Sequence, residues 1–350
     1  MKDTRTAYLK ELERLWPLMA KAYAAAMREN AGAIDMAGLQ KAIEARDVGA
    51  ALRALNVGPG LLAPVVVQAT ATYLAGGQYQ YEATKVATRG LPAGLRVAGS
   101  FDPGSARAAK WAQDFSSRMV VMITDDTRAL VRTAIDDGLA AGRSPFATAV
   151  KLAGRADNMG RRSGGIVGLH PQFQGYVDTA RAELSDPESM ANYLTRTRRD
   201  KRFDATVRKA IRDGKPLARQ DVERIAGRYA DRLLALRGET IARSETIEAL
   251  NTARRHSMKQ VIEDPTNGVT AADVTRVWDA TGDSKTRPAH SAMEGQAKPE
   301  GEPFEAPDGS RLMSPGDRSL GASGAMTIVC RCYMQLKVDA LAILVRAEGR

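Results

Sequence analysis

The stretch ARQDVERIAGRYADRLLALRGETIARSETIEALNTARRHSMKQV, residues 218–261, decides the fold. Its apolar residues recur at three- and four-residue steps, the period of one helix face. They are Val222, Ile225, Tyr229, Leu233 and Leu236. No proline interrupts the stretch, and its Ala, Leu, Arg and Glu residues lose little side-chain freedom in a helix. We therefore predict one long helix from about residue 218 to 261, with a weak point at Gly238.

Further helices precede this stretch. Met119, Ile123 and Leu130 recur with the same period, which predicts a long helix with one apolar face from Ser105 to about Gly142. A glycine-rich basic loop at 161–168 follows. Residues 170–209 are then expected to form a pair of helices, broken around 185–187 and ended by Gly214-Lys215-Pro216.

The first hundred residues contain three predicted helices between residues 4 and 75. Asp35 is the expected N-cap of the second, because its carboxylate can accept from backbone amides of the first turn. Gly58-Pro59-Gly60 separates the second helix from the third. Residues 76–105 are rich in glycine and proline and show no sustained period, so we expect a loop or linker there.

The composition changes after Asp264-Pro265, where turn residues multiply. Short strands are predicted at 274–278 and around Leu312. The clearest strand is predicted over 326–336. Its residues alternate between two faces, and the predicted core face carries Met326, Ile328, Cys330, Cys332, Met334 and Leu336.

These elements predict an α+β protein in three successive regions. Residues 1–104 would form an N-terminal helical region with its linker, and residues 105–262 a central helical bundle. Residues 263–350 would form a small C-terminal α+β domain.

The chain of 350 residues has a formal net charge of +10, which favours a polyanionic environment such as packaged DNA. With only two cysteines, a disulfide scaffold is excluded. The charged first residues are unlike a signal peptide, so we expect synthesis in the cytoplasm. The most apolar window, 61–75, is interrupted by polar residues and is shorter than the roughly 20 residues of a bilayer span. We therefore expect no membrane contact.

Three segments, taken in order, resemble the C-terminal domain of the phage Mu F-like head morphogenesis family. They are IARSETIEALNTARR (241–255), WDATGDSKTRPAHSAMEG (278–295) and LMSPGDRSLGASGAMTIVCRC (312–332). No single element is specific, whereas the ordered set is. The residues that carry the resemblance are Arg243 to Asn251, Trp278, Asp283, Arg287, His290, Gly295, Pro315-Gly316-Asp317, Cys330, Arg331 and Cys332.

The resemblance covers about a third of the chain well. It implies a minor head protein of a tailed phage or prophage that lies in the virion near the portal vertex. Its implied partners are the portal protein and other head proteins, and its implied roles are head assembly or DNA delivery. On this reading the protein is not an enzyme.

Cys330, Cys332 and His290, with Asp283 as a further candidate, are a possible zinc ligand set, because zinc takes thiolate and imidazole in a tetrahedron. Some members of the family carry a Cys-x-x-Cys pair after the aspartate. His290 stands in the place of its second cysteine and Arg287 in the place of its first. The alternation along 326–336 favours the other interpretation, in which both cysteines are small core residues and no metal or other cofactor is bound.

Two structural alternatives concern the other motif residues. Asp283, Arg287 and Arg331 either form a charged network that fixes the loop 282–295 to the last strand or are unrelated surface charges. Trp278 is expected in the core rather than stacked on a ligand.

A basic run between residues 195 and 209 is either a set of contacts to DNA phosphate, without base recognition, or a solvated helix face. No DNA-reading motif accompanies it. The candidate phosphate contacts are Arg196, Arg198, Arg199, Lys201 and Arg202.

The alternative function is a nucleotide- or nucleic-acid-directed enzyme or toxin whose C-terminal domain is catalytic. Glu300-x-Glu302 resembles the paired glutamates of ADP-ribosyltransferases, although a charge pair in a solvated loop also explains it. The sequence contains no glycine-rich phosphate loop, nucleophile elbow or His-Glu-x-x-His motif. The structural role is therefore preferred.

Overall fold

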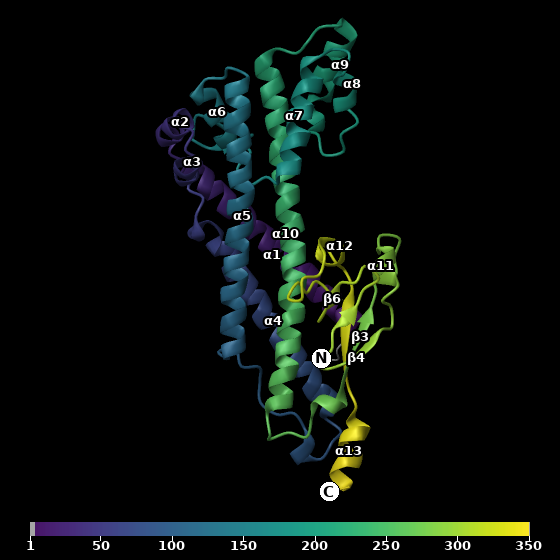
Figure 1. Ribbon diagram of the computed structural model, residues 1–350. Helices are drawn as coiled ribbons and strands as arrows, with labels where there is room; N and C mark the ends of the chain where they lie inside the picture. Colours follow the sequence, from purple (N-terminus) through teal and green to yellow (C-terminus); the bar gives the residue numbers. More distant parts are fainter. Residues whose placement is uncertain (1–3, 350) are drawn as a thin grey trace. The chain divides into compact units, whose positions relative to one another are not determined.

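The computed structural model describes residues 4–349 and is mostly helical, with a few small sheets (Figure 1). This confirms the predicted mostly helical α+β class. The two longest helices match their predictions closely. They are α5 (Ala106–Ala140) and α10 (Arg219–Glu263).

Gly238 does not interrupt α10. A Cβ atom at this position would lie 2.7 Å from Cδ1 of the Tyr23 ring, so the glycine gives that ring room against the helix. The sequence suggested a weak point here, whereas packing explains the glycine.

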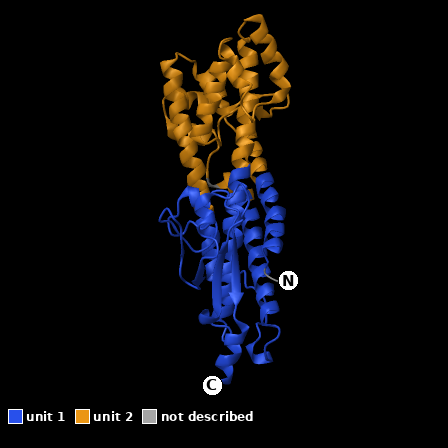
Figure 2. Cartoon of the chain, turned by 90° about the vertical axis from the view of Figure 1, so that its right-hand side faces the viewer, with its two compact units in different colours: residues 1–22, 65–115, 239–350 blue, residues 23–64, 116–238 orange. Residues whose placement is uncertain are grey.

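The chain forms two compact units, coloured separately in Figure 2. Unit 1 comprises residues 1–22, 65–115 and 239–350, and unit 2 comprises residues 23–64 and 116–238. Helices α1 (Arg5–Gly32), α5 and α10 contribute residues to both. The two units do not coincide with the three successive regions predicted, because each unit is assembled from segments that are distant in the sequence.

Unit 2 is a group of helices around one apolar core that includes Leu39, Val131 and Val177. A two-stranded hairpin joins Arg155–Ala156 (β1) to Arg162–Ser163 (β2). The helices and 3-10 turns in this unit include α2 (Met36–Glu44), α3 (Val48–Ala54), η1 (Pro59–Leu62), α6 (Pro145–Ala153), α7 (Pro171–Ser185), α8 (Met190–Tyr193), η3 (Lys201–Phe203) and α9 (Asp204–Asp213).

Capping residues explain where several of these helices begin and end. The Asp35 carboxylate accepts from the backbone amide of Gly38, as predicted. The predicted second helix is in fact two, because Asp47 caps α3 and Arg46 before it has a left-handed φ of 55°. Gly214 ends α9 in the left-handed region, in agreement with the predicted stop.

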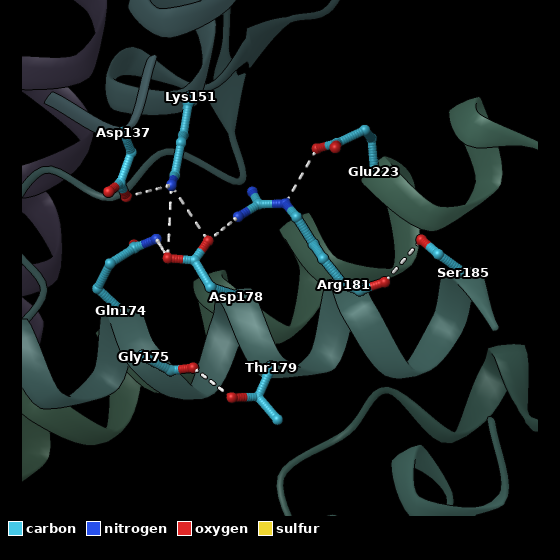
Figure 3. Close-up of polar contacts among 9 residues, drawn as sticks. All are labelled: Asp137, Lys151, Gln174, Gly175, Asp178, Thr179, Arg181, Ser185 and Glu223. Atoms are coloured by element: carbon cyan, nitrogen blue, oxygen red, sulfur yellow. Dashed lines mark hydrogen bonds and ion pairs between the residues drawn. The ribbon is translucent and has the colours of Figure 1, made fainter. Parts of the chain in front are cut away.

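A network of ion pairs connects four helices of unit 2 (Figure 3). The Lys151 ammonium of α6 lies 3.2 Å from the Asp178 carboxylate of α7 and 3.9 Å from Asp137 of α5. Arg181 of α7 lies 2.9 Å from Asp178 and 3.2 Å from Glu223 of α10. These contacts add polar links to a unit held together by its apolar core.

The predicted linker at 76–105 is wrong over its first half, where α4 (Ala63–Thr88) continues as helix. Its glycines were taken as loop residues, but they serve helix packing. A Cβ on Gly76 would lie 2.8 Å from the Leu250 carbonyl oxygen, and one on Gly77 would overlap the Phe101 ring. Because neither glycine has a side chain, the backbone of α4 can pack directly against Leu250 and Phe101.

Because α4 is longer than predicted, the segment 60–88 meets the length and hydropathy expected of a membrane-spanning helix. The same helix carries side chains that lie inside unit 1, among them Val65, Ala69 and Tyr73. Its Gln80 amide oxygen accepts a hydrogen bond from the buried Arg254 guanidinium at 3.1 Å. Core helices of soluble proteins meet the same length and hydropathy criteria, so meeting them is weak evidence for a membrane span.

The C-terminal part of unit 1 is built on a three-stranded antiparallel sheet of order β4-β3-β7. The central β3 (Val274–Asp279) confirms the strand predicted at 274–278. The other elements of unit 1 include η2 (Ala93–Leu95), η4 (Ala271–Asp273), α11 (Pro288–Ser291), β4 (Ala297–Pro299), β5 (Phe304–Glu305), β6 (Arg311–Leu312), α12 (Gly324–Thr327), β7 (Tyr333–Val338) and α13 (Ala340–Glu348).

The strand predicted over 326–336 is wrong in its first half. Residues 324–327 form α12, Val329 has a left-handed φ of 50°, and pairing with β3 begins only at Tyr333. Ile328, placed on the core face by alternation, is exposed. Cys330 and Cys332 are nevertheless buried, because a turn rather than a strand carries them inward.

Candidate functional site

Three side chains with metal-binding atoms meet in unit 1, although they come from distant parts of the sequence. His290 Nδ1 lies 3.2 Å from Cys332 Sγ and 3.6 Å from Cys330 Sγ. All three residues are buried, and their ligand atoms all lie within 4.8 Å of one another. Asp283 is not part of this cluster.

His290 reaches the cluster from α11, which begins with Pro288 at its first position. Two backbone hydrogen bonds join the end of the loop that carries α11 to Trp278 of β3. The Gly295 amide donates to the Trp278 carbonyl, and the Trp278 amide donates to the Gln296 carbonyl, each at 2.9 Å. Gly295 has a φ of 73°, which explains the glycine at this motif position.

Three neighbours hold the turn that carries the cysteines. The Val329 amide donates to Ser244 Oγ of α10 at 2.9 Å. The Arg287 guanidinium donates to the Ile328 carbonyl at 2.9 Å, and Thr281 Oγ1 donates to the Arg331 carbonyl at 2.7 Å. The positions of the two thiols are therefore set by contacts on both sides of Cys330.

The two thiols affect each other's titration. The hydrogen bond with Cys332 holds the pKa of Cys330 below its usual range, while the hydrogen bond with Cys330 and burial raise the pKa of Cys332. The two thiols are therefore a coupled pair.

Asp283 and Arg331 form a two-pronged ion pair, with Nη1 2.7 Å from Oδ2 and a second contact between Nη2 and Oδ1. The Arg331 guanidinium holds the pKa of Asp283 well below its usual range. The predicted charged network is thus present for this pair, whereas Arg287 binds a backbone carbonyl instead. Asp283 is engaged by Arg331, so it is not available as the fourth metal ligand.

A pocket of about 320 Å³ opens beside the cluster, and both His290 and Cys332 line it. Four cationic side chains also line it, and they come from α10, the loop 280–295 and the cysteine turn. They are Arg243, Lys285, Arg287 and Arg331. The Arg243 guanidinium also lies over the Trp16 ring, 4.2 Å from its centroid. The pocket is therefore suited to an anion next to the cluster.

Trp278 is fully buried, which agrees with the predicted core role. Its ring meets Phe304 and His290 edge to face, with centroids 5.4 Å and 6.1 Å apart. It thus supports the imidazole from within the core.

The motif on α10 supplies buried polar contacts to the turn at 315–317. The Asn251 side-chain amide donates to the Pro315 carbonyl at 2.9 Å. Arg318 lies 2.8 Å from the Glu245 carboxylate of α10. Gly316 has a φ of 83°, and a Cβ there would lie 2.9 Å from Ile247 Cγ2. The motif elements of 243–251 and 315–317 therefore fit each other directly.

Unit 1 contains a buried ion pair that the sequence did not predict. Arg276 on β3 is fully buried and lies 3.3 Å from the Glu300 carboxylate, whose side chain is 5% exposed. Its guanidinium also donates to the carbonyls of Met313, Pro299 and Glu302. Burial lowers the pKa of Arg276. The expectation of a solvated Glu300 is thus wrong, because the alternation along β3 directs Arg276 inward to meet it.

The basic run in unit 2 is divided between ion pairs and exposed charges. Arg196 lies 2.7 Å from Glu183, and Arg199 lies 2.9 Å from Asp204, with all four side chains largely buried. The exposed Arg202 pairs with the buried Asp200 at 2.6 Å. Arg198 and Lys201 are exposed. Arg196 and Arg199 therefore have structural roles, and the phosphate-contact prediction is reduced to the exposed residues.

Comparison with protein-family models, with curated proteins and with solved structures found no match to this chain.

Proposed function

We propose that this protein is a minor head protein of a tailed phage or prophage that acts at the portal vertex in head morphogenesis. The observation that carries the proposal is the position of the residues on which the resemblance rests. They are scattered between 243 and 332, yet they pack against one another in unit 1. The helix motif holds the turn 315–317, and the loop 280–295 meets the cysteine turn.

Residues that match a family by chance would not be expected to contact one another. Their mutual packing therefore supports a motif that specifies one structural module. Under the proposal, the helical part contacts the portal and other head proteins, and the C-terminal part is the compact module. The protein is made in the host cytoplasm and becomes part of the virion. Contact with packaged DNA is non-specific and involves the exposed charges Arg198, Lys201 and Arg202.

Co-expression with the portal protein of the same phage or prophage tests this proposal. The full-length chain should co-elute with the portal oligomer, and chemical crosslinks to the portal should fall on residues 1–262. The matched control is co-expression with the major capsid protein alone. Separate elution from the portal, together with absence of the chain from purified procapsids, would count against the proposal.

The enzyme alternative loses its best candidate residues. Glu300 is buried against Arg276, and the Glu302 carbonyl accepts from the same guanidinium. A paired-glutamate catalytic site needs both carboxylates free to face a substrate. A toxin would nevertheless kill its host on expression and lose that effect in Glu302→Gln, so host growth separates the two functions.

A further inference from the structure

The spacing of the three buried ligand atoms in unit 1 fits a tetrahedral metal ion. Zinc binds sulfur at about 2.3 Å and imidazole nitrogen at about 2.0–2.1 Å, so a sulfur and a nitrogen on one ion lie roughly 3.6 Å apart. The two observed nitrogen–sulfur distances are 3.2 Å and 3.6 Å. The backbone therefore already holds the ligands at a separation suited to zinc.

The metal-free interpretation of the cysteine pair rested on a predicted strand over 326–336 and on the absence of a fourth soft ligand, since Arg287 stands where the family has a cysteine. In that strand the two thiols would simply join a row of core side chains. The structure instead has a left-handed residue at Val329, and both thiols turn towards His290 Nδ1. His290 Nε2 is buried without a hydrogen-bond partner among residues 4–349, so Nδ1 is the ring nitrogen that meets polar groups.

We propose that His290 Nδ1, Cys330 Sγ and Cys332 Sγ bind one Zn²⁺, with the fourth coordination position open to the basic pocket. Binding displaces the thiol protons, because thiolate is the ligand. Two thiolates then balance the charge of the ion. Arg331 is paired with Asp283, so the other three cationic side chains of the pocket remain to attract an anion to the fourth position. They are Arg243, Lys285 and Arg287.

Cobalt substitution tests the ligand set in the full-length protein. Reduced, metal-depleted protein should bind one Co²⁺ and develop the near-ultraviolet charge-transfer band of cobalt thiolate, and Zn²⁺ should remove that band. The chain has only two cysteines, so the band can arise only at this cluster. Its absence in the wild-type protein would overturn the proposal.

Substitutions identify the ligands one by one. Cys330→Ser, Cys332→Ser and His290→Gln should each weaken Co²⁺ binding by more than about tenfold. His170→Gln is the matched control, since His170 is an exposed helix cap in unit 2, and it should leave binding unchanged. If the ligand variants unfold, a Zn²⁺-dependent rise in the melting temperature of the wild-type protein supports the site, and no rise counts against it. Undiminished Co²⁺ binding in folded His290→Gln would refute the assignment of the imidazole.

A separate measurement tests the open fourth position. Sodium azide, a small anionic metal ligand, should shift the visible bands of the Co²⁺ protein. The shift should weaken in Lys285→Gln, which removes one pocket charge, and persist in Arg311→Gln, an exposed arginine outside the pocket. No spectral response to azide would overturn the open position and assign a closed site.

Discussion

Arg276 and Glu300 form a buried ion pair in unit 1, with Nε 3.3 Å from Oε2 and the guanidinium fully enclosed. Removing one partner of such a pair leaves the other charge buried without compensation. We therefore predict that Glu300→Ala lowers the free energy of unfolding by about 3 kcal/mol. Glu302→Ala is the matched control, because the backbone carbonyl that accepts from Arg276 is kept in this variant. Urea denaturation of both variants measures the difference, and equal stabilities would contradict a structural role for Glu300.

Asp200 should make the stability of unit 2 depend on pH. The hydrogen bond from Arg202 lowers the pKa of this carboxyl from 3.8 to about 2. A folded-state pKa below the unfolded one contributes stability above the unfolded pKa, which is lost as the pH falls through the folded pKa. Asp200→Asn should therefore cost up to roughly 2 kcal/mol at pH 7, and its difference from wild type should close between about pH 4 and pH 2.

Melting temperatures across this pH range provide the check for Asp200. The exposed Asp213 supplies a control for the loss of a surface carboxylate, and Asp213→Asn should leave the melting temperature at pH 7 close to that of the wild type. A gap between Asp200→Asn and wild type that stays constant from pH 7 to pH 2 would contradict the titration argument.

Duplex DNA binding should depend on the exposed part of the basic run. Each phosphate contact contributes about 0.9 to the slope of log affinity against log salt. Replacing Arg198 and Lys201 by Ser should therefore flatten the slope by up to about 2 with the fold intact. Filter binding at several salt concentrations measures this. Arg199→Ser should act mainly by lowering stability, because it breaks the pair with Asp204. An unchanged slope in the double variant would assign the run to a solvated surface.

The close packing at Gly77 predicts a specific steric defect. Gly77→Ala should destabilise the protein by about 1–3 kcal/mol, because the new methyl group overlaps the Phe101 ring. A glycine in an open helix would show the opposite sign, since alanine favours helix. Gly175→Ala is the control, because Gly175 lies inside α7 and nothing lies within 4 Å of its Cβ position. Thermal unfolding compares the two, and a stabilised Gly77→Ala would show that α4 is not packed as described.

Sequence patterns predicted the elements whose side chains follow a regular period. The 3.6-residue period predicted α5 and α10, the capping carboxylate predicted the start of α2, and a short strand-like segment among turn residues predicted β3. They failed where a residue's role depends on a distant partner. Glycines such as Gly76 and Gly77 are typical of turns, and the sequence therefore predicted a loop. In the structure they lie in α4, where Leu250 and Phe101 pack so closely that a side chain would not fit.

The candidate site was predictable in its residues but not in its arrangement. The motif identified His290, Cys330 and Cys332, yet alternation placed the cysteines on a strand that does not extend to them. The turn depends on a contact from Ser244, 85 residues earlier. Glu300 was misjudged for a similar reason, since its partner Arg276 lies on β3, a strand 24 residues earlier in the sequence.

The segment order of the two units has a consequence for synthesis on the ribosome. Unit 2 lies wholly within residues 23–238, whereas unit 1 needs residues 1–22 together with residues 239–350. All of unit 2 has therefore emerged while unit 1 still lacks its sheet and its cysteines. Translation proceeds at roughly 5–20 residues per second, so the final 112 residues delay completion of unit 1 by several seconds. During that interval residues 5–22 of α1 lack their C-terminal partners, and a nascent chain from which residues 1–238 have emerged would present unit 2 complete and unit 1 without its sheet.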